Sequence, residues 1–225
     1  MTTATIAHRP PAIWAVGRNY AEHAQEMGGA ARLGYPIFFM KNPAAVVGDG
    51  AAIVLPPICD EHGPQVDWEG ELAFVIGRDC RDVPLADALS VVSGYACAND
   101  VSARWWQKEG SGGQFCRGKS FDTFCPLSAP TPAALVGDPQ ALTLRTRLNG
   151  EVVQESSTSL MLYPVATLVH ELSRGMTLLA GTVVLTGTPA GVGYARKPPR
   201  FLQAGDVVEV EITGVGRLRN PVRAG

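Results

Sequence analysis

The 225-residue sequence has no excess of charge of either sign, with 19 Lys and Arg against 21 Asp and Glu. It has no block of basic residues, so we expect neither nucleic acid nor an anionic membrane surface as a partner. It has no apolar run of the ~18 residues that a membrane-spanning helix needs. Its first residues also lack the charged and apolar regions of a signal peptide. We therefore expect a soluble, cytoplasmic protein.

Cysteine is scarce, and its spacing suggests no pairing. The cysteines are Cys59, Cys80, Cys97, Cys116 and Cys125. Their number is odd and no two have C-x-x-C spacing, which argues against a disulfide framework or a zinc site and for a reducing compartment. The sequence also has no G-x-S-x-G motif, so a serine hydrolase is not supported.

Glycine and proline are plentiful and scattered, with 25 Gly and 17 Pro. This distribution indicates many turns between short strands. The clearest signal is Asn149-Gly150 between two alternating segments, which predicts a β-hairpin. Strands do not alternate regularly with long helices, so a doubly wound parallel sheet is disfavoured. The predicted fold class is α+β, predominantly β.

The segment VDWEGELAFVIG, residues 66–77, places three carboxylates at the start of a predicted strand. Asp67, Glu69 and Glu71 share one face, because strand side chains alternate. A solvated outer face is the ordinary explanation. Here, however, the same face continues as Ala73 and Val75, and the opposite face is apolar. Such a strand is buried, and crowded buried carboxylates repel each other and are costly to desolvate.

A bound cation would remove this cost. Carboxylate oxygens suit a hard ion such as Mg²⁺, Mn²⁺ or Ca²⁺. Asp100, in CANDVSAR, follows an apolar segment and is a candidate third ligand. Taken alone, it would more often be the N-cap of the helix predicted in SARWWQ.

Four segments together resemble the C-terminal-type domain of the fumarylacetoacetate hydrolase family. They are, in order, VDWEGELAFVIG, GYACANDVSARWWQ, RGKSFDTFCPLSAP and VVLTGTPAGVG. The likeness extends from about Ile13 to Val222, so we expect a single catalytic domain over residues 1–225, with a lid-bearing segment at about residues 13–40. The resemblance implies a mixed β-sandwich roll with a few helices, and a homodimer.

The resemblance also implies one divalent cation, Mg²⁺ first, with Mn²⁺ or Ca²⁺ as alternatives. Its ligands would be Glu69, Glu71 and Asp100. Asp67 lies outside the family pattern, so we expect it to be a bystander.

His23 and Glu26 in NYAEHAQEMG lie three residues apart, on one face of a predicted helix. By itself this spacing indicates no more than a surface ion pair. The resemblance implies a catalytic dyad on a lid, with Glu26 orienting His23 as a general base. Gly28 and Gly29 would let such a lid move, so we expect it to be mobile or displaced without ligand and to close when a dicarbonyl acid binds.

Lys119 lies in CRGKSFD, and the resemblance implies that it faces the metal and stabilises a developing oxyanion. The surrounding segment GQFCRGKS also satisfies the P-loop pattern. A P-loop follows a buried strand and opens a helix, whereas KEGSGG precedes this segment and Pro126 limits any helix after it. A nucleotide site is therefore disfavoured.

The resemblance places further residues around the substrate. These are Lys41, Arg104, Gln107 and Thr188, the last favoured over Thr186. Family members often have Asp where this chain has Trp105.

The leading hypothesis is a metal-dependent hydrolase that cleaves a C–C bond in a β-diketone acid of the acylpyruvate or fumarylpyruvate type. His23 would activate water, and Lys119 would stabilise the enolate that leaves. Two alternatives keep the enolate chemistry: a decarboxylase of a 2-oxo diacid such as oxaloacetate, and a 2-hydroxydienoate isomerase. A third is a metal-stabilised structural or binding protein, which would not need His23 and Glu26 near the carboxylates. In the enzymatic cases the partner is a small dicarbonyl acid.

Overall fold

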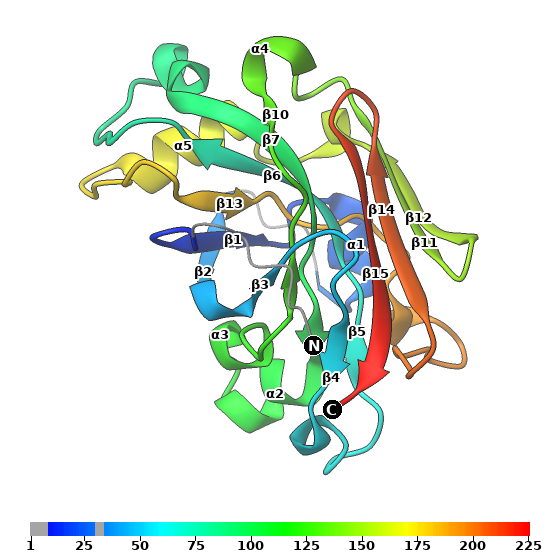
Figure 1. The fold of residues 1–225 in the computed structure, drawn as a ribbon. Helices are drawn as coiled ribbons and strands as arrows, with labels where there is room; N and C mark the ends of the chain where they lie inside the picture. The colour runs from blue at the N-terminus through cyan, green and yellow to red at the C-terminus, as the bar shows by residue number, and fades with distance from the viewer. Residues whose placement is uncertain (1–8, 30–33) are drawn as a thin grey trace.

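The computed structural model describes residues 9–29 and 34–225. Two main sheets pack against each other, as Figure 1 shows, with short helices at their ends and edges. The strands of the first sheet, in spatial order, are β10 (Thr131–Pro132), β7 (Val92–Asn99), β6 (Gly70–Ile76), β13 (Val183–Leu185), β1 (Ile13–Gly17) and β2 (Ile37–Lys41). Those of the second are β12 (Glu151–Ser157), β11 (Thr143–Leu148), β14 (Val207–Ile212), β15 (Gly216–Ala224) and β4 (Ile53–Leu55).

Both sheets are mixed. Neighbouring strands run antiparallel except β1 beside β13 and β15 beside β4. Two small pairs complete the strands: β3 (Val46–Val47) with β9 (Cys125–Pro126), and β5 (Val66–Asp67) with β8 (Ser102–Ala103). The helices are α1 (Ala21–Glu26), α2 (Arg104–Gln107), α3 (Phe115–Gly118), α4 (Ala133–Val136) and α5 (Val165–Ser173). The predicted class, predominantly β with a few helices, is confirmed.

Alternation of apolar and polar residues builds the core between the sheets. Strand β14 buries Val208, Val210 and Ile212 and leaves the residues between them partly exposed. Helix α5 packs its apolar stripe, including Leu168, on the same core. The predicted hairpin is also confirmed: β11 and β12 are joined by Asn149 and Gly150, with φ of 53° and 88°, the values that a type I′ turn requires.

The acidic segment is not the single strand that its sequence predicts. β5 ends at Asp67 and β6 begins only at Gly70. The two residues between them belong to neither strand, and Asp67 Oδ1 accepts a hydrogen bond of 2.9 Å from the backbone N–H of Trp68. β6 itself is buried on both faces, as predicted: Leu72, Phe74 and Ile76 lie in the main core, and Ala73 of the other face lies in a second apolar cluster with Phe39, Cys125 and Leu127.

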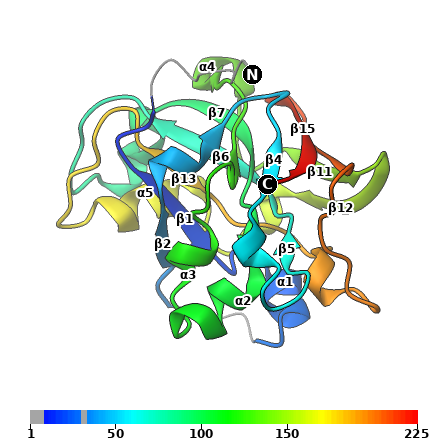
Figure 2. The same cartoon turned by 60° about the horizontal axis from the view of Figure 1, so that its bottom comes forward.

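Antiparallel pairing brings the distant acidic residues together. Gly70 of β6 pairs with Asn99 of β7, and the Asp100 N–H donates to the Glu69 carbonyl at 2.8 Å. The beginning of β6 therefore lies beside the end of β7. Helices α1, α2 and α3 are gathered around this end of the molecule, which Figure 2 brings forward. Within the described ranges, no helix is long and apolar enough to cross a membrane.

Candidate active site

The three predicted metal ligands form one cluster. Glu69, Glu71 and Asp100 each offer a carboxylate oxygen, and these oxygens lie within 4.8 Å of one another. All three side chains are buried, with exposures of 4%, 1% and 1%. Pairing of β6 with β7 supplies this proximity, and Glu69 lies directly before β6, two residues from Glu71.

Two lysines lie directly against this cluster. Lys119 Nζ is 2.6 Å from Glu69 Oε2 and 2.6 Å from Asp100 Oδ2. Lys41 Nζ is 2.5 Å from Asp100 Oδ1 and also donates to the Lys119 carbonyl. Burial alone lowers the pKa of Lys119, but Asp100 and Glu69 raise it above its ordinary value. Lys119 therefore stays charged.

Glu71 differs from its two neighbours in having no cation. Its Oε2 accepts a 2.7 Å hydrogen bond from the Gly187 N–H, and no ion pair reaches it within the described residues. Burial, followed by the charges of Asp100 and Glu69, raises the pKa of Glu71 well above its ordinary value. Burial also raises the pKa of Glu69. The charges of Lys119 and Arg104 outweigh this effect, so the pKa of Glu69 lies below its ordinary range. Glu71 is thus the carboxylate of the cluster whose ionised form lacks a cation, and a bound metal ion would supply one.

The donor set fits a hard divalent cation. Four buried carboxylates, Asp67, Glu69, Glu71 and Asp100, face three buried cations, Lys41, Arg104 and Lys119. The balance of four against three is one negative charge, which a divalent cation would convert to one positive charge. A positive centre built from oxygen ligands suits the binding of a small anionic acid.

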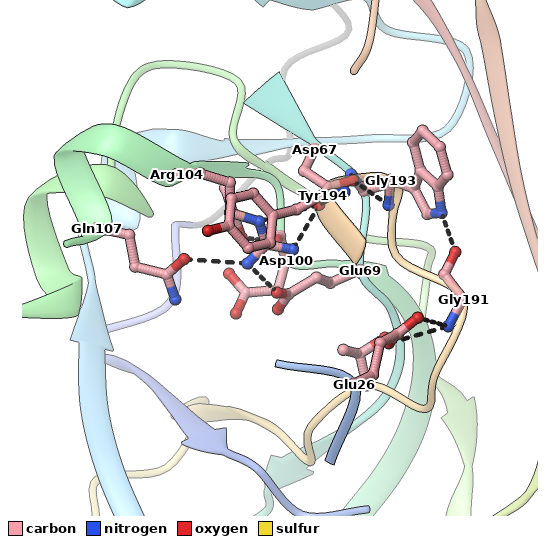
Figure 3. A network of polar contacts seen from close by, with 12 residues as sticks. Glu26, Asp67, Glu69, Asp100, Arg104, Gln107, Gly191, Gly193 and Tyr194 are labelled. Atoms are coloured by element: carbon pink, nitrogen blue, oxygen red, sulfur yellow. Dashed lines mark hydrogen bonds and ion pairs between the residues drawn. The ribbon is translucent and has the colours of Figure 1, made fainter. Parts of the chain in front are cut away.

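Asp67 has a structural role beside the cluster that the sequence did not predict. It stays outside the cluster of potential ligands, as predicted, but it is fully buried and holds Arg104. Its Oδ2 accepts from Arg104 Nε at 2.9 Å and from Nη2 at 2.7 Å. Arg104 Nη1 in turn donates to Glu69 Oε1 at 2.6 Å and to Gln107 Oε1 at 3.0 Å (Figure 3). Asp67 therefore positions an arginine that reaches the metal cluster.

We expect Asp67→Asn to destabilise the fold strongly. The amide would turn an N–H₂ toward groups that now donate to the carboxylate, among them the backbone N–H groups of Gly193 and Tyr194. Breaking a buried ion pair costs about 3 kcal/mol or more of unfolding free energy, measurable by urea denaturation without added metal. The control is Glu155→Gln, which removes an exposed pair with Arg145 and should leave stability almost unchanged. Equal effects of the two substitutions would contradict this role for Asp67.

His23 and Glu26 lie in α1, as predicted, and His23 is only 6% exposed. Glu26 Oε2 lies 3.4 Å from His23 Nδ1, and the two Glu26 oxygens accept from the Gly191 N–H at 2.9 and 3.2 Å. Figure 3 shows that Gly191 lies in the same turn as Gly193 and Tyr194, which hold Asp67. One short turn thus joins the dyad to the Arg104 side of the metal cluster.

Two glycines allow the backbone to come close enough to Glu71 and Glu26 to donate hydrogen bonds to them. Gly187 has a φ of 95°, and a Cβ there would lie 2.7 Å from the Asn19 Cβ. Gly191 has a φ of 107°, and a Cβ there would lie 2.1 Å from the Val153 carbonyl oxygen. These positive φ values and close contacts exclude other residues. The glycines of TGTPAGVG are therefore needed to place N–H groups on Glu71 and Glu26.

A cavity of about 530 Å³ lies beside the cluster, and of the three predicted ligands only Glu69 lines it; Glu26 does not line it either. The predicted site residues that line it are His23, Glu69, Arg104, Gln107, Lys119 and Thr188. Neither Lys41 nor Asp100, which its ammonium contacts, lines the cavity. The sequence did not point to other lining residues: Arg18, Phe39, Lys108 and Phe115. The cavity is thus ionic on the metal side and partly apolar and aromatic elsewhere.

Thr188 reaches the cavity with its hydroxyl already engaged. It donates to the Gly70 carbonyl at 2.9 Å and accepts from Gln154 Nε2 at 2.8 Å. Thr186 donates to the Leu72 carbonyl at 2.8 Å and does not line the cavity. The preference for Thr188 over Thr186 agrees with this placement. Contact of Thr188 with a substrate carboxylate stays a prediction, and it requires the hydroxyl to turn away from Gly70.

The P-loop alternative has no structural support. The 3₁₀ turn Glu109–Ser111 comes before Gly113, where a P-loop would need a buried strand, and α3 ends after a single turn at Gly118. The Lys119 ammonium is also held by two carboxylates, which would repel a phosphate. The predicted opening of the lid stays a prediction, and residues 30–33 of that segment lie outside the described residues.

Comparison with known proteins decides the family. The family model described as fumarylacetoacetate (FAA) hydrolase C-terminal matches residues 12–223. The chain belongs to the fumarylacetoacetate hydrolase family. Among solved structures it is similar to a fumarylacetoacetate hydrolase from the psychrophilic Exiguobacterium antarcticum, with 45% identity and a TM-score of 0.86 over 97% of this chain and 77% of the other. The resemblance and the fold expected from it are confirmed.

Members of this family that are similar to the chain have different names. A 5-carboxymethyl-2-hydroxymuconate delta-isomerase from Mycobacterium smegmatis is 45% identical, with a TM-score of 0.83 over 96% of this chain and 80% of the other. A mitochondrial oxaloacetate tautomerase from Xenopus laevis is 44% identical over 95% of this chain. The chain spans 66% of the length of that tautomerase. The relatives agree on an enzyme of this family and differ in the reaction named.

Proposed function

We propose that this protein is a divalent-metal-dependent enzyme that moves a proton at the carbon next to the carbonyl of a small 2-oxo acid, and so interconverts its keto and enol forms. The observation that carries the proposal is that His23, Lys119 and Glu69 line one cavity. A base and a cation thus flank the place where a 2-oxo acid would bind beside the acidic cluster. The names of the oxaloacetate tautomerases and the isomerase among the relatives support the same chemistry.

Glu69, Glu71 and Asp100 would hold the cation, which would polarise the 2-oxo group and acidify the carbon beside it. Glu26 lies on the Nδ1 side of His23, and this arrangement leaves Nε2 to take up the substrate proton. Gly191 fixes Glu26 through its N–H, so the orientation of the imidazole does not depend on the substrate.

Lys119 would stabilise the negative charge that forms on the enolate oxygen, since its ammonium is buried beside Glu69 and Asp100. Arg104 and Gln107 would hold the substrate carboxylate from the cavity wall. His23 then returns the proton, to carbon or to oxygen, and the atoms balance without any further reactant.

Cleavage of a C–C bond in a β-diketone acid is the second candidate, and the dyad favours it. An imidazole oriented by a carboxylate suits activation of water as well as proton transfer from carbon. The residues required are the same, and the two reactions differ in whether water lies between His23 and the substrate. Decarboxylation of oxaloacetate would use Lys119 and the cation without the dyad.

The test compares these reactions on one pair of variants. We expect the wild type with Mg²⁺ to convert enol to keto oxaloacetate, followed by ultraviolet absorbance, faster than it hydrolyses acetylpyruvate or releases pyruvate from oxaloacetate. His23→Ala should lower tautomerisation by about 10²–10⁴-fold, the usual contribution of a general base. The control is His62→Ala, because His62 is exposed and stacks on Trp105 outside the cavity.

Faster acetylpyruvate hydrolysis than tautomerisation by the wild type would move the proposal to the second candidate. Full tautomerisation by His23→Ala would remove His23 as the base.

A further inference from the structure

Among the residues that the structure describes, four cationic side chains line the cavity, and three of them are engaged. Arg104 and Lys119 contact the carboxylates of the metal cluster. Lys108 Nζ lies 3.9 Å from the centre of the Tyr194 ring. Arg18 is the fourth, and within the described residues its guanidinium has no ion pair, hydrogen bond or aromatic partner. Residues 1–8 and 30–33 contain no Asp or Glu, so they offer it no side-chain carboxylate.

The backbone at Arg18 is held in an unfavourable conformation. Its φ is 58°, in the left-handed region that L-residues other than Asn, Asp and His seldom adopt. The chain on both sides enforces this: β1 ends at Gly17, and the Asn19 side chain donates to the Tyr163 and Thr186 carbonyls at 3.1 and 2.7 Å. Strain that the surroundings enforce is concentrated at functional sites. An arginine that is strained, half-buried and unpaired in a cavity indicates a ligand.

Gly29, which follows α1, leaves room for this guanidinium. A Cβ at Gly29 would lie 2.9 Å from Arg18 Nη1. Glu109 is the one carboxylate of the cavity wall outside the metal cluster; it is exposed, and no ion pair joins it to Arg18 within the described residues. The Arg18 charge therefore stays available to an anion in the cavity.

We propose that Arg18 binds the second carboxylate of a 2-oxo diacid whose 2-oxo acid end lies at the Glu69, Glu71 and Asp100 cluster. The inference rests on the proposed function, because it assumes that a 2-oxo acid binds at that cluster. A guanidinium matches a carboxylate with two parallel hydrogen bonds, and a half-buried site strengthens them. Arg104 and Lys119 are committed to the metal end and Lys108 lies over the Tyr194 ring, so among the described cations of the cavity wall recognition of the far end falls to Arg18. The substrate class is thus a diacid in preference to a monoacid with an apolar tail.

The experiment measures binding, so that it does not depend on turnover. The probes are 2-oxoglutarate and 2-oxopentanoate, which share the 2-oxo acid end and the number of carbons and differ in the far carboxylate. Calorimetry with Mg²⁺ should give tighter binding of 2-oxoglutarate to the wild type. Arg18→Asn should weaken 2-oxoglutarate binding at least about tenfold and leave 2-oxopentanoate binding unchanged, as expected for loss of a charged hydrogen-bond donor.

Asparagine tolerates a positive φ, so Arg18→Asn should keep or raise the melting temperature while it loses the diacid. Arg18→Met is a second neutral variant and should show the same loss. Arg117→Met is the control, because Arg117 lies over the Trp106 ring and does not line the cavity. The proposal would be overturned if Arg18→Asn weakened the binding of both probes equally, or weakened the binding of neither. A wild type that binds the diacid selectively but does not tautomerise oxaloacetate would refute the proposed function alone.

Discussion

Replacing Glu71 by glutamine will abolish metal-dependent activity and, in the same variant, the stabilisation that metal gives. Glu71 is the member of the acidic cluster that no cation neutralises within the described residues. Glutamine keeps the size of the side chain and an oxygen for the Gly187 N–H, but removes the charge. A ligand that binds only the folded state at 100 times its Kd adds about 2.7 kcal/mol to stability. That increment should disappear.

Without metal, Glu71→Gln should be no less stable than the wild type. Burial and the charges of Asp100 and Glu69 disfavour the ionised form of Glu71, so its removal relieves repulsion. We therefore expect the melting temperature of Glu71→Gln without metal to equal or exceed that of the wild type. Thermal unfolding of both proteins with EDTA and with millimolar Mg²⁺ measures this. A variant that Mg²⁺ still stabilises as much as the wild type would remove Glu71 from the ligand set.

The metal cluster could be predicted from the sequence because its geometry follows from local rules. Alternation along a strand places Glu69 and Glu71 on one side whatever the rest of the fold does. Their burial followed from apolar residues on both faces of the same strand. Asp100 was harder, since only the pairing of β6 with β7 brings it near, and the family resemblance supplied that link.

The role of Asp67 could not be predicted, because its partners come from distant segments. Arg104 lies 37 residues further along the chain, and the Gly193 and Tyr194 N–H groups lie 126 and 127 residues away. Alternation placed Asp67 with Glu69 and Glu71, but the strand breaks at Trp68. A single-strand pattern cannot reveal a break that is stabilised by contacts made elsewhere in the fold.

The positions of the lysines show the same limit. Both Lys41 and Lys119 were singled out by resemblance, yet only Lys119 lines the cavity. Lys41 is at the end of β2, and its ammonium contacts Asp100, which does not line the cavity either. Sequence patterns identify which charges gather at a site. The depth at which each one lies depends on packing between strands.

The lysine that borders the cavity gives the second large expected effect. Lys119→Met should lower turnover by about 100-fold or more, the usual loss when one preorganised donor to a developing oxyanion is removed. Methionine retains much of the length of the side chain and fills the buried space without the charge. Because the ammonium lies 2.6 Å from both Glu69 and Asp100, its removal leaves those carboxylates more negative. Metal should therefore bind the variant at least as tightly as the wild type.

Loss of turnover with retained metal affinity distinguishes a catalytic lysine from one that only assembles the site. The measurements are kcat for tautomerisation at saturating Mg²⁺ and the Kd for Mn²⁺ by electron paramagnetic resonance. Lys108→Met is the matched control: it removes a cation from the same cavity, but one held over the Tyr194 ring, and it should change kcat little. If Lys119→Met lost metal affinity and turnover in the same proportion, the role of the lysine would be to hold the metal-binding carboxylates in place. Another donor would then have to stabilise the enolate charge.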